Sequence, residues 1–497
     1  MAKDGGAHPR REPRLSGALT LERFTQVFHD CADFSLRRLR LWGEDGPEAV
    51  LCSIVGMART ERVNDYILRP LLRSGPPPEN ADLPAWLAAS VLYNQDVRVE
   101  TSLDRAVGGV INGSCAIFLS GCPGALLAAA ATEEKRAVGE PENEPALKGA
   151  RDSFVESLRT NTSLVRRRLR APELKVREHI VGRQTLTPVD VLWLDGIADP
   201  DTVARLDRGL ADLDIDGIEA AGDLEEYLTG NLSTPFPLMP CTQRPDRFCR
   251  GLLEGRVGLL ADGIPLGWLA PGTLDQFFKT GQDRAYHWMA ASALRLIRYS
   301  CAALTILLPG LYIALVTFHP EAIPVKLALS IVAAKQEVPF STIFEVLIML
   351  LSFEVIQEAG LRLPGPIGAT VSILGGLVVG NAAVEARIVS PAVLIAVAIA
   401  GVAGYTQPSQ DLGSALRLWR FLLAILASLG GLFGLTAGCA ALIYHLAALE
   451  TFGVPYLAPF TTGRPTPARG PSLLRLPLPW LKWRDGPIHT RNRRNQR

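Results

Sequence analysis

Three acidic side chains and one arginine lie in apolar surroundings where they could bind or gate ions. Glu345 lies within the run 340–353, and Glu354, Glu358 and Arg362 follow at steps of four residues. Ionised side chains are costly among apolar groups, so each is a candidate for a functional role. On one helix Glu345 would lie on one face. The other three would lie near the opposite side, where they could simply form a salt-bridged surface.

The sequence contains no pattern typical of an enzyme. GxSxG, HExxH and a Cys/His cluster are missing, and the seven His residues are scattered. The turns that could cradle a nucleotide lack GxGxxG and GxxxxGK[ST]. We therefore expect no catalytic residues, no metal site and no cofactor.

The apolar residues that must position these charges begin near Arg298 and dominate the range 286–450. Ile297–Phe318 is long enough to cross a bilayer, and Pro309 at its centre predicts a kink. Further apolar segments lie at 340–353, 367–384, 391–404 and 421–449. We expect a helical transmembrane domain of four or five segments. Four are preferred, with 340–353 re-entrant or interfacial.

Small residues recur at helical spacing in two of these segments. They are Gly368, Ser372, Gly376 and Gly380 in one, and Gly430, Gly434 and Gly438 in the other. Helices associate in lipid where small residues let their backbones approach. Tight helix packing is the simpler interpretation of both stripes, and the lining of a narrow pore is the alternative.

The residues before this domain predict a cytoplasmic α/β head of two similar subdomains, 21–130 and 171–285. A disordered tail at 1–20 precedes them, and a charged helical connector at 131–170 joins them. Each subdomain has a strand-like apolar run, a glycine (Gly56 or Gly196) and an amphipathic helix, which indicates a duplication. Arg166, Arg167 and Arg168 end the connector; a solvated face is expected there, with phosphate or lipid binding as the alternative.

Two local signals in the second subdomain are specific. Asp199 is expected to cap a helix that begins with Pro200. The run RVGLLADGIPLGWL predicts a β-hairpin, with Asp262-Gly263 in a tight turn and Pro265 confining the second strand to a sheet edge.

Charge sets the expected partners and orientation. The 51 Lys and Arg nearly balance the 50 Asp and Glu, which argues against a nucleic-acid partner. Arg295 and Arg298 precede the first span, so the positive-inside rule places the head in the cytoplasm. With four spans the basic tail at 451–497 is also cytoplasmic, where we expect it to be solvated or near anionic membrane lipid.

Long stretches of the sequence resemble the A subunit of the GerA family of spore germination receptors. They include LKVREHIVGRQTLTPVDVLWLDGIADP, LPGLYIALVTFHPEAIP and FEVIQEAGLRLPGPIGATVSILGGLVVGNAAV, in the family's order. The resemblance implies a multi-pass subunit of a nutrient germinant receptor in the spore inner membrane or the cell membrane. It also implies an oligomeric cation channel that this chain forms or gates, working with a B-type transporter-like subunit and a C-type lipoprotein subunit.

The alternative is a non-conducting scaffold that couples a germinant-binding partner to a cytoplasmic response. The charges among apolar residues weigh against such a plain anchor. Pro309, Glu354, Glu358 and Arg362 match motif positions of the family.

The chain also departs from the family's pattern. Lys335-Gln336-Glu337 replaces the usual Arg-Glu-Gly, Asn381 and Glu385 replace Gln, and Arg387 replaces Gly. These changes alter charge near the presumed conduction path, so we expect ion preference or gating to differ.

Overall fold

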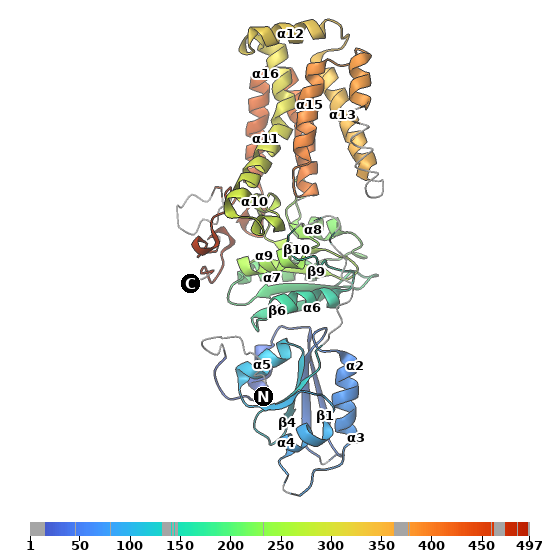
Figure 1. Cartoon of the computed structure of the whole chain (residues 1–497), viewed down its shortest axis with the longest axis vertical. Coiled ribbons are helices and arrows are strands. Elements are labelled where there is room, and N and C mark those ends of the chain that lie inside the picture. The colour runs from blue at the N-terminus through green and yellow to red at the C-terminus, as the bar shows by residue number, and fades with distance from the viewer. Residues whose placement is uncertain are drawn as a thin grey trace.

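The computed structural model contains two five-stranded β-sheets and a helical bundle arranged one after another along its long axis (Figure 1). It describes residues 15–131 apart from 45 and 80, residues 141, 144 and 148–361 apart from 232, residues 376 and 378–461 apart from 459, and residues 473–495 apart from 485. The first sheet lies at one end, the second in the middle and the bundle at the other end (Figure 1).

The first sheet has five antiparallel strands in the order β1-β2-β4-β5-β3. The strands are β1 (Phe34–Arg40), β2 (Glu48–Ile54), β3 (Val97–Glu100), β4 (Ser114–Leu119) and β5 (Ala125–Ala129). Its helices are α1 (Leu21–Val27), α2 (Thr60–Arg62), η1 (Val63–Leu68), α3 (Arg69–Arg73), α4 (Leu83–Trp86), η2 (Leu87–Val91) and α5 (Leu103–Ile111). Alternate strand residues enter separate apolar cores, so both faces of the sheet are covered.

The second sheet repeats this order as β6-β7-β9-β10-β8, again antiparallel. Its strands are β6 (Leu174–Val181), β7 (Thr187–Leu194), β8 (Cys241–Thr242), β9 (Val257–Ala261) and β10 (Gly267–Ala270). Its helices are α6 (Leu158–Arg168), α7 (Pro200–Ala211), α8 (Ala221–Thr229) and α9 (Pro245–Glu254). The shared strand order is the arrangement expected of a duplicated unit.

The local signals in the second sheet have mixed outcomes. The cap is confirmed, because the Asp199 side chain accepts a hydrogen bond from the Thr202 backbone N–H at the start of α7. β9 and β10 form the predicted hairpin, and Asp262-Gly263 forms a turn with Gly263 at φ +81°. The connection is longer than the predicted tight turn, because the pairing ends at Leu260 and Gly267. Pro265 lies in the connection before β10, so this strand can pair with both β9 and β8 and is not at an edge.

A buried ion pair joins the two sheets. Arg166 of α6 donates to both carboxylate oxygens of Asp33, at 2.6 and 2.7 Å, and both side chains are 1% exposed. Beside it, the Ala32 N–H donates to the Val176 carbonyl at 2.7 Å, at the outer edge of β6. The expected solvated face is therefore wrong for Arg166, whose charge is used between the subdomains.

The bundle consists mainly of helices that run along the long axis (Figure 1). α10 (Leu274–Phe277) and η3 (Gly281–Arg284) belong to the head and connect the second sheet to the bundle. The elements of the bundle are α11 (Trp288–Phe318), η4 (Pro320–Ala322), α12 (Val325–Lys335), α13 (Thr342–Leu361), α15 (Pro391–Gly404) and α16 (Gln410–Ala448). α12 lies across the end farthest from the sheets (Figure 1). Among the described residues, α11 and α16 are long and apolar enough to cross a membrane.

The run 340–353 is not a separate short segment. Its residues from Thr342 onward belong to the 20-residue helix α13, which packs against α11, α15 and α16. Val346, Met349 and Leu350 are buried against these neighbours, and the helix continues past Glu354 to Leu361. The count of four or five membrane segments stays a prediction.

The helix α16 reverses direction in its middle. Gly430 and Gly431 have non-helical backbone angles, and Gly431 has φ +56° and ψ −136°. Beyond them the chain returns along itself, so the rings of Trp419 and His445 lie 5.8 Å apart. The expected helical stripe of Gly430, Gly434 and Gly438 is therefore wrong at Gly430, where the helix is interrupted. A glycine pair permits this reversal because glycine has no Cβ and adopts backbone angles that other residues rarely adopt. Each half, 410–429 and 432–448, falls in the length range of a membrane span.

The C-terminal segment folds back against the second sheet (Figure 1). Its elements are β11 (Glu450–Thr451), β12 (Val454–Pro455), η5 (Leu478–Trp480) and η6 (Gly486–Ile488). Thr451 donates to the Gly272 carbonyl at 2.7 Å, and Arg484 donates to the Leu253 carbonyl at 2.7 Å. The expected solvated tail is wrong for Arg484 and Arg475, which are 8% and 7% exposed because backbone carbonyls bind them.

Candidate functional site in the helical bundle

Glu345 ties three helices together near the end of the bundle farthest from the sheets. It lies in the first turn of α13, is fully buried, and accepts a 2.8 Å hydrogen bond from the Ser390 backbone N–H through Oε2. Ser390 directly precedes α15, so the carboxylate faces the positive end of that helix. Tyr312 of α11 hydrogen-bonds the Ser390 side chain. Within the described residues, the Oε1 atom of Glu345 has no hydrogen-bond partner.

A second charged group joins α13 to the first half of α16. Glu354 forms ion pairs with Arg420 and Arg417, and Gln357 accepts a 2.7 Å hydrogen bond from Arg417. Arg420 is only 2% exposed. Nine residues separate Glu354 from Glu345, so this group lies about 14 Å nearer the sheets along α13. A buried charge of this kind is stable only while its partner is present.

The two arginines of this group are functional candidates that the sequence prediction missed. Their signal is two bases three residues apart in an otherwise apolar helix, LRLWRFLLAIL. The sequence suggested instead that Glu354 pairs along its own helix, but its described partners are on α16. Glu358 is exposed on α13, and Arg362 lies outside the described residues.

A third charged group connects the bundle to the head. Asp283 of η3 is 1% exposed and pairs with Arg295 at 2.9 Å and Arg298 at 2.8 Å, both on α11. Burial alone would raise the pKa of Asp283, but the hydrogen bonds and positive charges of the two arginines outweigh it and lower that pKa. Arg298 also donates to the Phe278 carbonyl at 2.9 Å, so the start of α11 is held firmly to the head.

The glycines of the predicted C-terminal stripe lie where the two halves of α16 meet. A Cβ on Gly434 would come within 2.0 Å of the Leu426 carbonyl oxygen, and one on Gly438 within 2.4 Å of Leu423. Pro309 is buried in α11, and the adjacent Gly310 approaches Leu435 of the returning half.

The other stripe is described in part. Gly380 lies against Leu394 of α15 and Gly376 faces Phe353 of α13, so both lie at helix contacts within one chain. Asn381 is exposed. Gly368 and Ser372 lie outside the described residues.

Two positions at which the resemblance implies a departure from the family's pattern meet in space. Glu337, between α12 and α13, lies 3.4 Å from Arg387, which precedes α15. Arg387 has φ +52°, a left-handed conformation that favours glycine. At a position where the resemblance implies glycine, Arg387 thus keeps the turn and pairs with Glu337.

The outer surface of the bundle is apolar. Large exposed hydrophobic side chains occur on three of its helices: Leu351, Val355, Ile395, Val402, Leu418 and Phe433. Contiguous apolar surface on this scale indicates contact with lipid or with another protein.

Comparison with known proteins shows similarity along almost the whole chain. The family model described as Bacillus/Clostridium GerA spore germination protein matches residues 22–486. Uncharacterized membrane protein YfkQ of Bacillus subtilis (strain 168) is 35% identical over 438 residues, covering 88% of this chain and 85% of that protein. Spore germination protein KA of the same organism is 32% identical over 454 residues, covering 91% and 82%.

One solved structure is also similar. It is the crystal structure of the N-terminal domain of the A subunit of the Bacillus megaterium spore germinant receptor GerK3. The sequences are 24% identical, and the match covers 50% of this chain and 92% of that one with a TM-score of 0.40.

Proposed function

Because this chain belongs to the GerA family of Bacillus/Clostridium spore germination proteins, we propose that it is a membrane subunit of a nutrient germinant receptor that forms or gates an oligomeric cation channel. The family expected from the quoted stretches is confirmed. The channel itself, its partners and its orientation are parts of the proposal.

The observation that carries the proposal is the pairing of the buried Arg420 with the partly buried Glu354 inside a bundle whose exterior is apolar. A helical anchor in lipid needs no buried charges, and such charges are expensive to keep. They are typical of proteins that conduct ions or change conformation in the membrane.

Two of the three predicted acids, Glu345 and Glu358, have different roles in this proposal. Glu345 holds α13 to the start of α15, so it acts in gating by fixing helix positions. Glu358 is exposed on α13, so it can face the pore when several copies assemble. One chain encloses little space by itself, and oligomerisation therefore belongs to the proposal.

The proposal also includes the orientation of the chain in the membrane and its partner subunits. The chain enters the bundle from the second sheet at α11 and returns to that sheet after α16, so the head and the C-terminal segment lie on one side. Arg295 and Arg298 favour the cytoplasm for that side. The proposed partners are a B-type transporter-like subunit, which senses the nutrient, and a C-type lipoprotein subunit.

The test is cation flux through liposomes that hold this chain with its partner subunits. We expect nutrient-dependent flux in the wild type and changed conductance or selectivity in Glu358→Gln, which removes one negative charge. Glu219→Gln, the same change at an exposed head position, should leave flux unchanged. Equal flux in all three proteins would remove Glu358 from the pore.

One observation favours the alternative, a non-conducting scaffold. Glu345 and Glu354 both make contacts within a single chain, as they would in a rigid anchor. A protein that stays monomeric in membranes and gives no nutrient-dependent flux with its partners would support the scaffold over the channel.

A further inference from the structure

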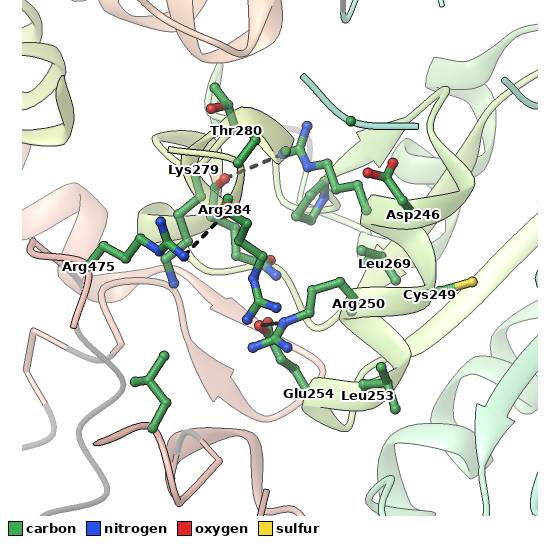
Figure 2. A pocket seen from close by; sticks show the side chains of 18 of the residues that line it. Asp246, Cys249, Arg250, Leu253, Glu254, Leu269, Lys279, Thr280, Arg284 and Arg475 are labelled. Atoms are coloured by element: carbon green, nitrogen blue, oxygen red, sulfur yellow. Dashed lines mark hydrogen bonds and ion pairs between the residues drawn. The ribbon is translucent and has the colours of Figure 1, made fainter. Parts of the chain in front are cut away.

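A cavity of about 580 Å³ lies where the second sheet, the start of α11 and the C-terminal segment meet. α9 contributes Arg250 and Glu254, η3 contributes Arg284, and the C-terminal segment contributes Arg475 and Arg484. Figure 2 shows Arg284 between Arg475 and the Arg250–Glu254 pair. Segments far apart in the sequence thus surround one space.

The lining of this cavity is strongly basic. Nine Lys and Arg line it against two acids, Asp246 and Glu254. Five of the bases have a carboxylate partner: Arg168 with Asp152, Arg247 with Glu144, Arg250 with Glu254, Lys279 with Asp275, and Arg295 with Asp283. In the part of the chain that the structure describes, Arg284, Arg475 and Arg484 have no carboxylate at salt-bridge distance.

Two of these three arginines are held in place by neutral groups. Arg475 donates to the carbonyls of Asp283 and Tyr286, and Arg484 donates to the carbonyls of Leu253 and Asn492. Carbonyl oxygens fix a guanidinium but leave its full positive charge. The cavity is therefore positively charged before any ligand enters.

The pKa values of the three arginines agree with this picture. Removal from water is the largest cause that lowers them, and neighbouring arginines add to it: Arg250 beside Arg284 and Arg484, and Arg295 beside Arg475. The pKa of Arg284 falls to about 10. The same positive surroundings stabilise the charged form of Glu254. Burial would raise the pKa of Glu254, but the positive charges of Arg250, Lys279 and Arg256 lower it to about 2.

We propose that this cavity binds an anionic phosphate group, carried either by a soluble phosphorylated compound or by an anionic lipid headgroup. Guanidinium groups match phosphate oxygens in shape and charge, and three of them here have no described carboxylate at salt-bridge distance. The volume admits a ligand larger than a single phosphate. Bound there, the anion would join α9, η3 and the C-terminal segment at the foot of the bundle. The inference uses none of the bundle acids on which the channel proposal rests.

The test uses the full chain purified in an uncharged detergent and titrated calorimetrically with inorganic pyrophosphate at low ionic strength. We expect saturable binding that Arg284→Gln weakens about tenfold or more, as expected for the loss of one charge-assisted contact. The Arg284 side chain makes no hydrogen bond to described residues, so the variant should fold, and an unchanged melting temperature verifies this. Arg208→Gln, the same charge change at an exposed position on α7, is the matched control and should bind normally.

A second arm separates the two sources of phosphate. The titration is repeated in nanodiscs of phosphatidylcholine alone and of phosphatidylcholine with phosphatidylglycerol. Loss of pyrophosphate binding only with phosphatidylglycerol identifies a lipid headgroup as the occupant, whereas equal binding in both identifies a soluble compound. Failure of the wild type to bind millimolar pyrophosphate in detergent and in phosphatidylcholine, or equal weakening by Arg284→Gln and Arg208→Gln, would overturn the proposal.

Discussion

Asp190 lies in β7 with its carboxylate completely buried. Thr162 donates a 2.8 Å hydrogen bond to Oδ2, while Oδ1 has no partner among the described residues. Burial raises the pKa of Asp190 to about 6, against opposing contributions from Thr162 and Arg159. The charged form is therefore disfavoured in the folded head.

The sign of the pH effect follows directly. The folded pKa of Asp190 exceeds its unfolded value, so the native state binds the proton more tightly between pH about 4 and about 6. The free energy of unfolding should fall by about 3 kcal/mol as the pH rises through this window, and stay low above it. Asp190→Asn should flatten this dependence and raise the melting temperature at pH 7.5 relative to wild type. Thermal unfolding of the detergent-solubilised chain at several pH values checks it, with exposed Asp214→Asn as control; parallel curves for wild type and Asp190→Asn would contradict the prediction.

At the scale of elements, the reversal inside α16 depends on Gly431. Its φ of +56° with ψ of −136° is strained for any residue with a Cβ, and that Cβ would lie 2.9 Å from Phe318. Gly431→Ala should destabilise the bundle by about 1–3 kcal/mol or more. Gly413→Ala is the matched control, since Gly413 is helical with open space around it and should gain about 0.5–1 kcal/mol. The melting temperatures of both variants in detergent measure the difference, and a Gly431→Ala protein as stable as wild type would argue against the reversal.

What could be predicted from the sequence was local. The Asp199 cap, the β9–β10 hairpin and the long apolar helix around Pro309 each depend on neighbouring residues, and the structure contains all three. The reversal at Gly430-Gly431 could not be predicted, because a glycine pair in an apolar run also fits a continuous packed helix. The pairing of Glu354 with Arg420 was missed for another reason: the residues are 66 positions apart, and only the packing of α13 on α16 brings them together.

At the scale of the whole molecule, the pair of Asp33 and Arg166 couples the first sheet to the second. Removing the carboxylate alone leaves a buried, uncompensated guanidinium, so Asp33→Ala should cost about 3–5 kcal/mol. Hydrogen exchange should then speed up at β6 and at residues 30–33. Asp33→Leu combined with Arg166→Met replaces the pair by apolar groups and should recover most of the loss. Unchanged exchange in Asp33→Ala would show that other contacts hold the sheets together.

The return of the chain to the second sheet has a mechanical consequence. The start of α11 is attached to the second sheet's side of the molecule through the ion pair of Arg298 with Asp283. The segment after α16 is attached there again, because Thr451 donates to the Gly272 carbonyl. These contacts attach the bundle to the second sheet at the end nearest that sheet, whereas its far end lies away from the sheet (Figure 1). A small tilt of the second sheet would give its largest displacement at the far end, around Glu337 and Arg387.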